Sequence, residues 1–171
     1  MEQHPPVIFT TLYPYAREVV DALAEGGKTL AVAESCTGGL LGAVVTSVPG
    51  ASMVFVGGLI TYSIEAKLCL GVPREVMDRY GVVSAECAAE MARAAAVFMG
   101  ADVGVGITGV AGPGGATREE PRGAVYIGLF SRWTGASAVR FLFEGDRAAV
   151  RTQAVGAALS RIRSVGVHSG G

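Results

Sequence analysis

The sequence predicts an α/β protein, a three-layer α/β sandwich with a mixed sheet that forms a single domain. Helical stripes alternate with short apolar runs over most of the chain, which is typical of helices packed on the faces of a sheet. Two β-branched and aromatic runs then follow one another across a short turn, which adds an antiparallel hairpin. Of the 171 residues, 50% are hydrophobic, so we treat 1–171 as one domain with an ordered core over about 9–166.

The first third of the chain predicts two helices and two strands. Residues 13–25 carry four apolar residues on one helical stripe, and a glycine pair ends this helix. The apolar run 28–34 predicts a buried strand, and 36–48 predicts a helix that a Pro-Gly pair closes. Residues 53–63 are β-branched and aromatic, so they predict a strand in which a glycine pair indicates a bulge.

Helices dominate the middle of the chain. A short helical turn over 64–71 is followed by a second short helix that begins at Pro73 and ends at Tyr80, since proline suits the first helical position. Ser84 then predicts an N-cap for a helix over 85–99, because its hydroxyl can accept a hydrogen bond from the first turn.

Strands return before a last helix. Residues 101–109 predict a strand that enters the glycine-rich loop 110–122. The runs 123–132 and 136–144 predict a hairpin, joined by a short turn that ends in glycine. Asp146 is expected to cap a final helix over 147–165.

Charge and hydropathy exclude several classes of function. Lys and Arg total 14 against 15 Asp and Glu, which argues against a nucleic-acid binder because such proteins usually carry a basic excess. No apolar run reaches the roughly 18 residues of a membrane span. The first residues show neither a basic start nor an apolar signal core. We therefore expect a cytoplasmic protein that does not contact membranes.

Cysteine and histidine usage restricts the chemistry further. The three cysteines are Cys36, Cys69 and Cys87. They form no C-x-x-C pair, which predicts reduced packing residues. The two histidines, His4 and His168, lie in the tails, which disfavours a Ser-His-Asp triad or an interior zinc site. We expect neither a metal nor a cofactor, and an interior lysine would be informative because only two lysines stand beside twelve arginines.

The segment AESCTGG, residues 33–39, leads from a predicted strand into a predicted helix. A helix N-terminus offers free N–H groups that can hold an anion or the oxyanion of a tetrahedral intermediate. Ser35 stands where the nucleophile of a strand–turn–helix elbow stands, although Ser35 or Thr37 can equally be a simple helix cap. Cys36 is a rival nucleophile, but without a histidine partner it is better interpreted as a packing thiol.

The segment ITYSIEAK, residues 60–67, carries a second candidate group. Tyr62 and Lys67 can meet across the strand end and the turn that follows. Ser-Lys and Ser-Tyr-Lys arrangements activate a hydroxyl without histidine, provided that the lysine is neutral. The alternative is a surface lysine paired with Glu65 or Glu34. The apolar neighbours that favour burial of Lys67 are Ile64, Leu68 and Leu70.

The segment GITGVAGPGG, residues 106–115, overlaps a literal G-x-G-x-x-G from Gly104 to Gly109. A dinucleotide-binding motif must open a helix, and here Pro113 and further glycines follow, so that interpretation is rejected. A glycine loop at a strand end remains, suited to close approach of a ligand or serving as a connector.

The segment EGDRAAVR, residues 144–151, places Arg147 and Arg151 one turn apart at a helix start. Cations there oppose the helix dipole, so a bound phosphate would explain them. The alternative is pairing with Glu144, Asp146 or another surface acid.

Together these motifs resemble the CinA C-terminal family, the nicotinamide mononucleotide deamidases also called PncC. The resemblance rests on AESCTGG, TYS-x-EAK with LGV, GITGVAGPGG, PRGAVYIGL and F-x-GDR-x-x-VR-x-Q, in this order, over about residues 13–162. It implies a three-layer α/β/α sandwich. It also implies a metal-free hydrolase of pyridine-nucleotide salvage, which converts the carboxamide of nicotinamide mononucleotide to nicotinic acid mononucleotide and ammonia.

The resemblance also implies roles for particular residues. The family's serine, tyrosine and lysine fall on Ser35, Tyr62 and Lys67, which would act by acyl transfer with Lys67 and Tyr62 relaying the proton. Backbone N–H groups of 36–39 would bind the oxyanion, and Arg147 would hold the 5′-phosphate. The substrate-binding set implied is Cys36, Thr37, Gly38, Gly39, Thr108, Gly109, Gly112, Gly114 and Arg147.

Two positions depart from the family pattern. Ile64 stands where the family has Asn, and Arg122 stands where it has a smaller or apolar residue. The chain also lacks the pyrophosphatase-type domain that many relatives carry ahead of this one, so it resembles the stand-alone form. Family members resemble dimers, which predicts a homodimer or higher homo-oligomer. The alternative function is a nucleotide-binding module linked to competence or DNA damage with little or no turnover, which Ile64 favours.

Overall fold

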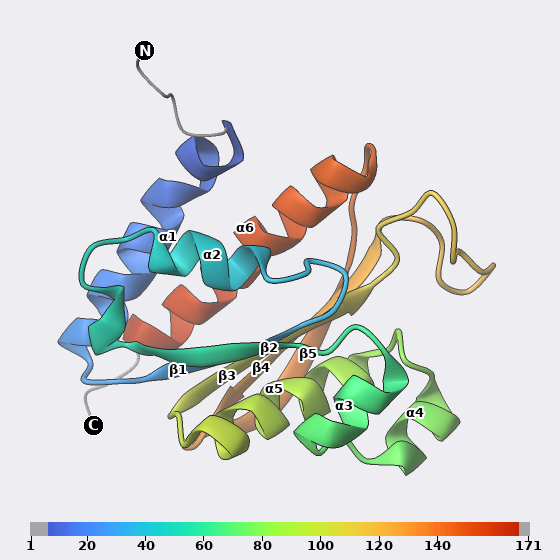
Figure 1. The fold of residues 1–171 in the computed structure, drawn as a ribbon, viewed down its shortest axis with the longest axis horizontal. Helices are drawn as coiled ribbons and strands as arrows, with labels where there is room; N and C mark the ends of the chain where they lie inside the picture. Colours follow the sequence, from blue (N-terminus) through green and yellow to red (C-terminus); the bar gives the residue numbers. More distant parts are fainter. Residues whose placement is uncertain (1–6, 168–171) are drawn as a thin grey trace.

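The computed structural model describes residues 7–167 as a five-stranded sheet between two layers of helices (Figure 1). The strand order is β2-β1-β3-β4-β5; α1, α2 and α6 cover one face, and α3, α4 and α5 cover the other. The elements are α1 (Val7–Glu25), β1 (Leu30–Glu34), α2 (Leu40–Thr46), η1 (Ala51–Met53), β2 (Phe55–Ile60), α3 (Ile64–Leu70), α4 (Arg74–Tyr80), α5 (Ala85–Met99), β3 (Val103–Gly109), β4 (Ala124–Ser131), β5 (Gly135–Leu142) and α6 (Arg147–Val167). This confirms the predicted three-layer class; the tail histidines, His4 and His168, lie outside the described residues.

The sheet is mixed, as predicted, with its parallel part around β1. All five residues of β1 are buried, and the strand pairs in parallel with both β2 and β3. A strand covered on both faces favours a continuous apolar run, and the first four residues of LAVAE are apolar with no alternating pattern. β4 is antiparallel to both of its neighbours, β3 and β5, and Ser131 pairs with Gly135 across the predicted hairpin. The carboxyl ends of β1, β2 and β3 therefore meet at one edge of the sheet.

The glycines of the G-x-G-x-x-G motif have a packing role within β3. A Cβ added at Gly104 would collide with the carbonyl oxygen of Ala92, and one at Gly106 with that of Ala88. Gly128 on β4 faces the Ala88 carbonyl in the same way. Because glycine and alanine face each other here, α5 approaches the sheet at backbone distance. The first part of the motif is thus a helix-packing surface.

The N-terminal helix begins earlier than predicted, at Val7, and continues through Pro14. Proline inside a helix removes one backbone hydrogen bond, which normally disfavours it. Here the apolar stripe that includes Leu12, Ala16 and Leu23 is buried in the core that α1 shares with α6. Tertiary packing of that stripe outweighs the local cost.

Two boundaries near the cavity described below differ from the prediction. α2 begins at Leu40 instead of residue 36, and β2 covers only Phe55–Ile60, after the short η1. The pairing of β1 with β2 skips Val56, so the predicted bulge lies just before the glycine pair. The caps predicted at Ser84 and Asp146 are confirmed, since both side chains accept backbone N–H groups of the helices that follow.

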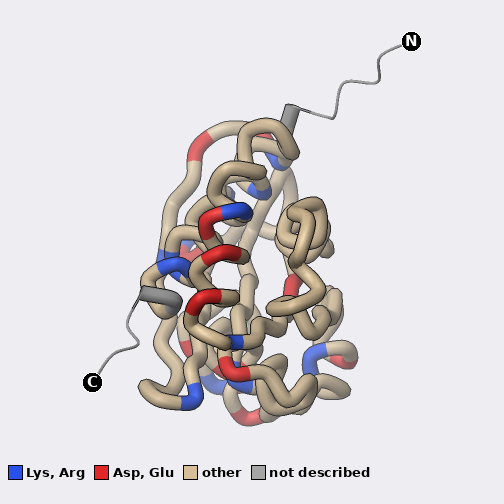
Figure 2. Tube along the Cα trace, turned by 90° about the vertical axis from the view of Figure 1, so that its left-hand side faces the viewer, with Lys and Arg blue, Asp and Glu red and all other residues tan. Residues whose placement is uncertain are grey.

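The surface carries both signs of charge. On the side shown in Figure 2, Lys and Arg positions are interspersed with Asp and Glu positions, in keeping with the formal charge of -1. Among the helices of residues 7–167, none is long and apolar enough to cross a membrane.

Candidate functional site

A cavity of about 230 Å³ opens at the sheet edge where β1, β2 and β3 end. It is lined by Ser35, Cys36, Tyr62, Lys67, Val82, Val83, Thr108, Gly109, Val110, Ala111, Gly112, Gly114, Gly115 and Arg147. In α/β sheets, ligands bind in such crevices beyond the carboxyl ends of parallel strands. The loop 110–122 extends beyond this edge (Figure 1), and its first part lines the cavity.

Ser35 and Lys67 form a buried pair in this cavity. Lys67 Nζ donates to Ser35 Oγ over 3.2 Å and to the Thr61 carbonyl over 2.6 Å. Lys67 is only 2% exposed, which contradicts the alternative of a surface lysine paired with an acid. The expected burial among apolar neighbours is partly wrong: Ile64 is 41% exposed, whereas Leu70 shares the buried side of α3 with Lys67.

Burial also changes the proton affinity of this lysine. Desolvation lowers the pKa of Lys67 below its ordinary value of 10.5, while the nearby Cys87 and Cys36 thiols act in the opposite direction. Arg147, the other cation that lines the cavity, is not among the causes of this shift in pKa. A lysine with a lowered pKa has a larger neutral fraction, and in that form Nζ can accept the Ser35 proton.

The turn of residues 35–39 differs from the expected helix start. Neither Ser35 nor Thr37 caps α2, whose N-cap is Gly39 and has no side-chain hydrogen bond. The buried Glu34 carboxylate takes this place and accepts the N–H groups of Gly39, Leu41 and Gly42 over 3.1, 3.1 and 2.9 Å. The helix N-terminus is therefore neutralised by the chain's own carboxylate and is closed to a substrate anion.

This arrangement reduces the expected oxyanion donors. The Gly39 N–H is donated to Glu34, and the Gly38 N–H is donated to the Ser35 carbonyl. The N–H groups of Cys36 and Thr37 donate to no other residue within residues 7–167, and of the two residues only Cys36 lines the cavity. The N–H of the residue after the nucleophile is the donor that a strand–turn–helix elbow uses.

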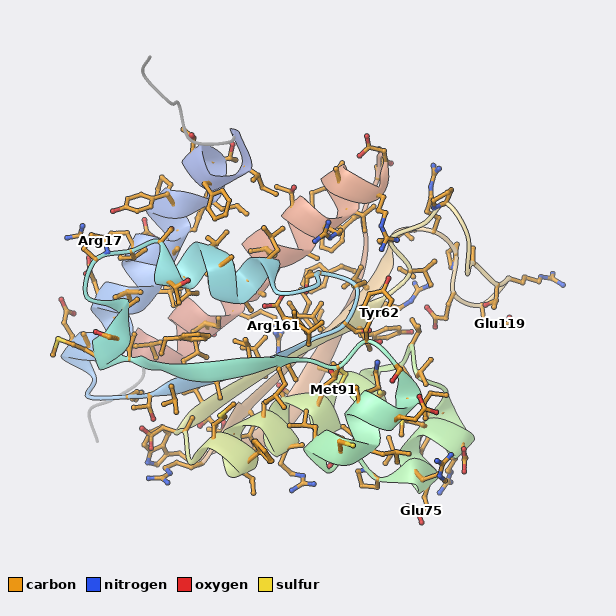
Figure 3. The ribbon with its side chains drawn as sticks, in the orientation of Figure 1. Arg17, Tyr62, Glu75, Met91, Glu119 and Arg161 are labelled. Carbon is orange, nitrogen blue, oxygen red and sulfur yellow. The ribbon has the colours of Figure 1, made fainter. Side chains whose placement is uncertain are left out.

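Tyr62 and Arg147 meet at the rim of the cavity. Tyr62 is 59% exposed and lies just beyond the end of β2 (Figure 3). Arg147 Nη2 donates to the Tyr62 hydroxyl over 3.0 Å, and Nη1 donates to the Gly112 carbonyl over 2.8 Å. Tyr62 thus contacts Arg147, and in the described part of the chain it has no hydrogen bond to Lys67. Arg147 and Arg151 have no ion pair among residues 7–167, so the expected alternative of acidic partners is not observed.

The remaining predicted binding residues divide into two groups. Thr108, Gly109, Gly112 and Gly114 line the cavity, and the buried Thr108 hydroxyl donates to the Val82 carbonyl over 2.7 Å. Thr37, Gly38 and Gly39 belong to the turn behind Cys36 and do not line it. Sequence reasoning missed the lining residues Val82, Val83, Val110, Ala111 and Gly115. Small apolar residues in loops carry no chemical signal of their own, although Val110, Ala111 and Gly115 lie inside the segment GITGVAGPGG.

The cysteines follow the packing interpretation in two of three cases. Cys36 and Cys87 are buried, and Cys69 is exposed on α3. Burial raises the pKa of the Cys36 thiol to about 11, with the Glu34 carboxylate acting in the same direction. A thiol of that kind stays protonated near neutral pH and is a poor nucleophile.

We therefore expect Cys36→Ala to change the turnover proposed below by less than about threefold, because the oxyanion donor at this position is backbone. Initial rates of ammonia release, measured before and after treatment with a thiol-blocking reagent, check this. If Cys36→Ala loses activity and Ser35→Ala keeps it, the nucleophile is Cys36.

The fold and the cavity define an α/β/α protein with a buried serine–lysine pair at the carboxyl ends of parallel strands. The family model of the CinA C-terminal domain matches residues 12–165, so the chain belongs to this family. A CinA-like protein of Thermotoga neapolitana is 47% identical over 146 residues, which are 85% of this chain and 35% of that protein. The chain thus spans about a third of the length of the curated relatives it matches.

Solved structures agree in fold. The competence/damage inducible protein CihA from Agrobacterium tumefaciens has a TM-score of 0.87 and 32% identity, over 96% of this chain and 99% of that one. A CinA superfamily protein from Klebsiella pneumoniae has a TM-score of 0.87 and 33% identity, over 92% of this chain and 98% of that one.

Proposed function

We propose that the protein is a nicotinamide-nucleotide amidohydrolase that converts nicotinamide mononucleotide to nicotinic acid mononucleotide and ammonia. The observation that carries the proposal is the 3.2 Å contact of Lys67 Nζ with Ser35 Oγ, at a lysine that burial makes easier to deprotonate. This pair supports acyl transfer without histidine or metal. The nucleotide is implied by the motif resemblance, and the cavity offers Arg147 as a cation without a carboxylate partner in residues 7–167.

In the proposed reaction, Ser35 Oγ attacks the carboxamide carbon and its proton passes to the neutral amine of Lys67. The carbonyl oxygen becomes an oxyanion that accepts the Cys36 N–H. The C–N bond then breaks as the amide nitrogen takes the proton from the Lys67 ammonium and leaves as ammonia, which returns Lys67 to the neutral amine. A water molecule, deprotonated by Lys67, attacks the resulting ester. The ester C–O bond then breaks, Lys67 gives its proton to Ser35 Oγ, and the acid is released with free Ser35.

Tyr62 and Arg147 act from the rim in this scheme. Tyr62 accepts a hydrogen bond from Arg147, which leaves its own O–H directed to a substrate group or to the departing nitrogen. Arg147 would hold the 5′-phosphate by charge-assisted hydrogen bonds. A homo-oligomeric assembly and a cytoplasmic location stay predictions.

The test is ammonia release from nicotinamide mononucleotide, nicotinamide riboside and nicotinamide with the purified chain. We expect the mononucleotide to be the best substrate by kcat/KM. Binding of the mononucleotide without ammonia release would contradict the enzyme and favour the binding module.

Arg147→Ala is expected to raise KM for the mononucleotide roughly ten- to hundredfold, because a charge-assisted phosphate contact is worth about 1.5–3 kcal/mol. The riboside lacks the phosphate, so its KM should change much less. Steady-state kinetics on both substrates checks this. Equal losses on the two would mean that Arg147 supports the reaction centre through Tyr62 and Gly112.

A further inference from the structure

Arg151 contacts the turn of residues 35–39 but does not line the cavity. It stands one turn after Arg147 on α6, and its Nη2 donates to the Thr37 carbonyl over 2.8 Å, across 114 residues of sequence. Its side chain is half-buried, Nε is buried without a hydrogen-bond partner, and no carboxylate pairs with it within residues 7–167. Burying a guanidinium nitrogen without a hydrogen-bond partner or a counter-ion is costly, so this single backbone contact is an unusual use of the group.

Glu34 contacts the same turn from its other end. Its carboxylate accepts the N–H of Gly39 and of two residues in the first turn of α2. Between the two contacts lies Gly38 with φ +61°, followed by Gly39 with φ +93°. Both values are in the left-handed region, which is accessible to glycine and gives the chain freedom there. A turn with two such residues needs outside contacts to stay in one conformation.

The two contacts act on opposite backbone groups. Arg151 holds a carbonyl oxygen, and Glu34 holds N–H groups, so the peptide planes from Thr37 to Gly39 are fixed from both sides. Cys36 lies just before them and lines the cavity, and in the described chain its N–H donates to no other residue. Ser35 at the start of the turn remains against Lys67.

We propose that Arg151 is a positioning residue that, together with Glu34, holds the turn of residues 35–39 in the conformation that aims the Cys36 N–H at the developing oxyanion. This inference rests on the amidohydrolase function proposed above. It differs from a phosphate-binding role, because a positioning residue affects the transition state and a phosphate ligand affects binding of the nucleotide.

The kinetic test compares Arg151→Met with Arg151→Lys and with Arg161→Met. Arg161 is a matched control: it lies on the same helix (Figure 3), is half-buried, has a buried Nε without a partner, and donates to Ser137, away from the turn. We expect Arg151→Met to lower kcat by roughly ten- to hundredfold, as for a misplaced oxyanion donor, with KM changed less than about threefold. The loss of kcat should be equal for the mononucleotide and the riboside, and the midpoint of the pH dependence of kcat/KM should stay unchanged.

Arg151→Lys should recover part of kcat, since an ammonium can donate to the Thr37 carbonyl, whereas Arg161→Met should leave kcat near wild type. A rise in KM confined to the mononucleotide would overturn the proposal and make Arg151 a phosphate ligand. A loss in Arg151→Met no larger than in Arg161→Met would also overturn it.

A second readout does not depend on activity. Backbone amide exchange, measured by NMR, should become faster at Gly39 in Arg151→Met and stay unchanged in Arg161→Met, because loss of one contact loosens the turn. Unchanged exchange at Gly39 in Arg151→Met would overturn the proposed clamp. If the wild-type chain releases no ammonia, the proposed function fails, while the exchange at Gly39 still decides whether Arg151 fixes the turn.

Discussion

Replacing Ser35 by Ala is expected to lower kcat for ammonia release by about 10⁴-fold or more, the usual scale for a removed nucleophile. The substitution deletes the atom that forms the acyl intermediate and leaves the Cys36 N–H in place. Lys67 keeps its 2.6 Å hydrogen bond to the Thr61 carbonyl, so the fold and nucleotide binding should change little. Single-turnover ammonia release, thermal unfolding and equilibrium binding of the mononucleotide together measure the effect.

Ser47→Ala supplies the matched control for this variant. Ser47 is the C-cap residue of α2, and its hydroxyl donates to the Val44 carbonyl over 2.6 Å. It does not line the cavity. Removing the Ser47 hydroxyl should lower the free energy of unfolding somewhat and leave the rate of ammonia release almost unchanged. Turnover of Ser35→Ala within about tenfold of wild type would remove Ser35 from the nucleophile role.

The second large effect concerns Lys67. Lys67→Met is expected to remove nearly all activity, because it deletes the base and keeps the volume and apolar packing of the stem. In the wild-type chain, kcat/KM should rise with pH through an apparent pKa below 10.5, since desolvation lowers the pKa of Lys67 and only the neutral amine accepts the Ser35 proton. Lys67→Arg should not restore turnover, because a guanidinium does not lose its proton in this range.

The lowered pKa of Lys67 should also make the free energy of unfolding depend on pH. Between the lowered pKa in the folded chain and the ordinary value in the unfolded chain, the unfolded state binds more protons. The free energy of unfolding therefore rises with pH through this window, and below it the folded chain carries the cost of a buried ammonium. Lys67→Met should abolish this slope in denaturant unfolding measured across pH.

Near-normal turnover of Lys67→Arg would contradict the role of Lys67 as the base and would show that the residue supplies only positive charge.

Much of the fold was predictable because it depends on local patterns. The apolar run at residues 28–34 predicts a buried strand, and β1 (Leu30–Glu34) is that strand. Ser84 and Asp146 mark helix starts through hydrogen bonds that span only three residues. The motifs at 33–39, 60–67 and 106–115 were also recognisable, since each combines a strand end with polar or glycine residues. Their family was therefore identifiable before any contact was known.

Other features had no local signal. The boundary at Leu40 depends on Glu34. Its carboxylate accepts N–H groups at the start of α2 and so replaces a Ser or Thr cap. The passage of α1 through Pro14 depends on burial against α6. In both cases a contact outside the local pattern outweighs propensity.

The sequence by itself determined the class of the fold, the family and the residue types available for chemistry: a serine, a tyrosine and a lysine in recognisable motifs, with no histidine between the tails. Only the tertiary structure decided how they combine. Lys67 meets Ser35 across 32 residues, and Arg147 meets Tyr62 across 85, because parallel strands bring their carboxyl ends to one edge and α6 begins beside it. Hydrogen bonds and desolvation act over a few ångströms in space, and that proximity is set by the packing of all three layers.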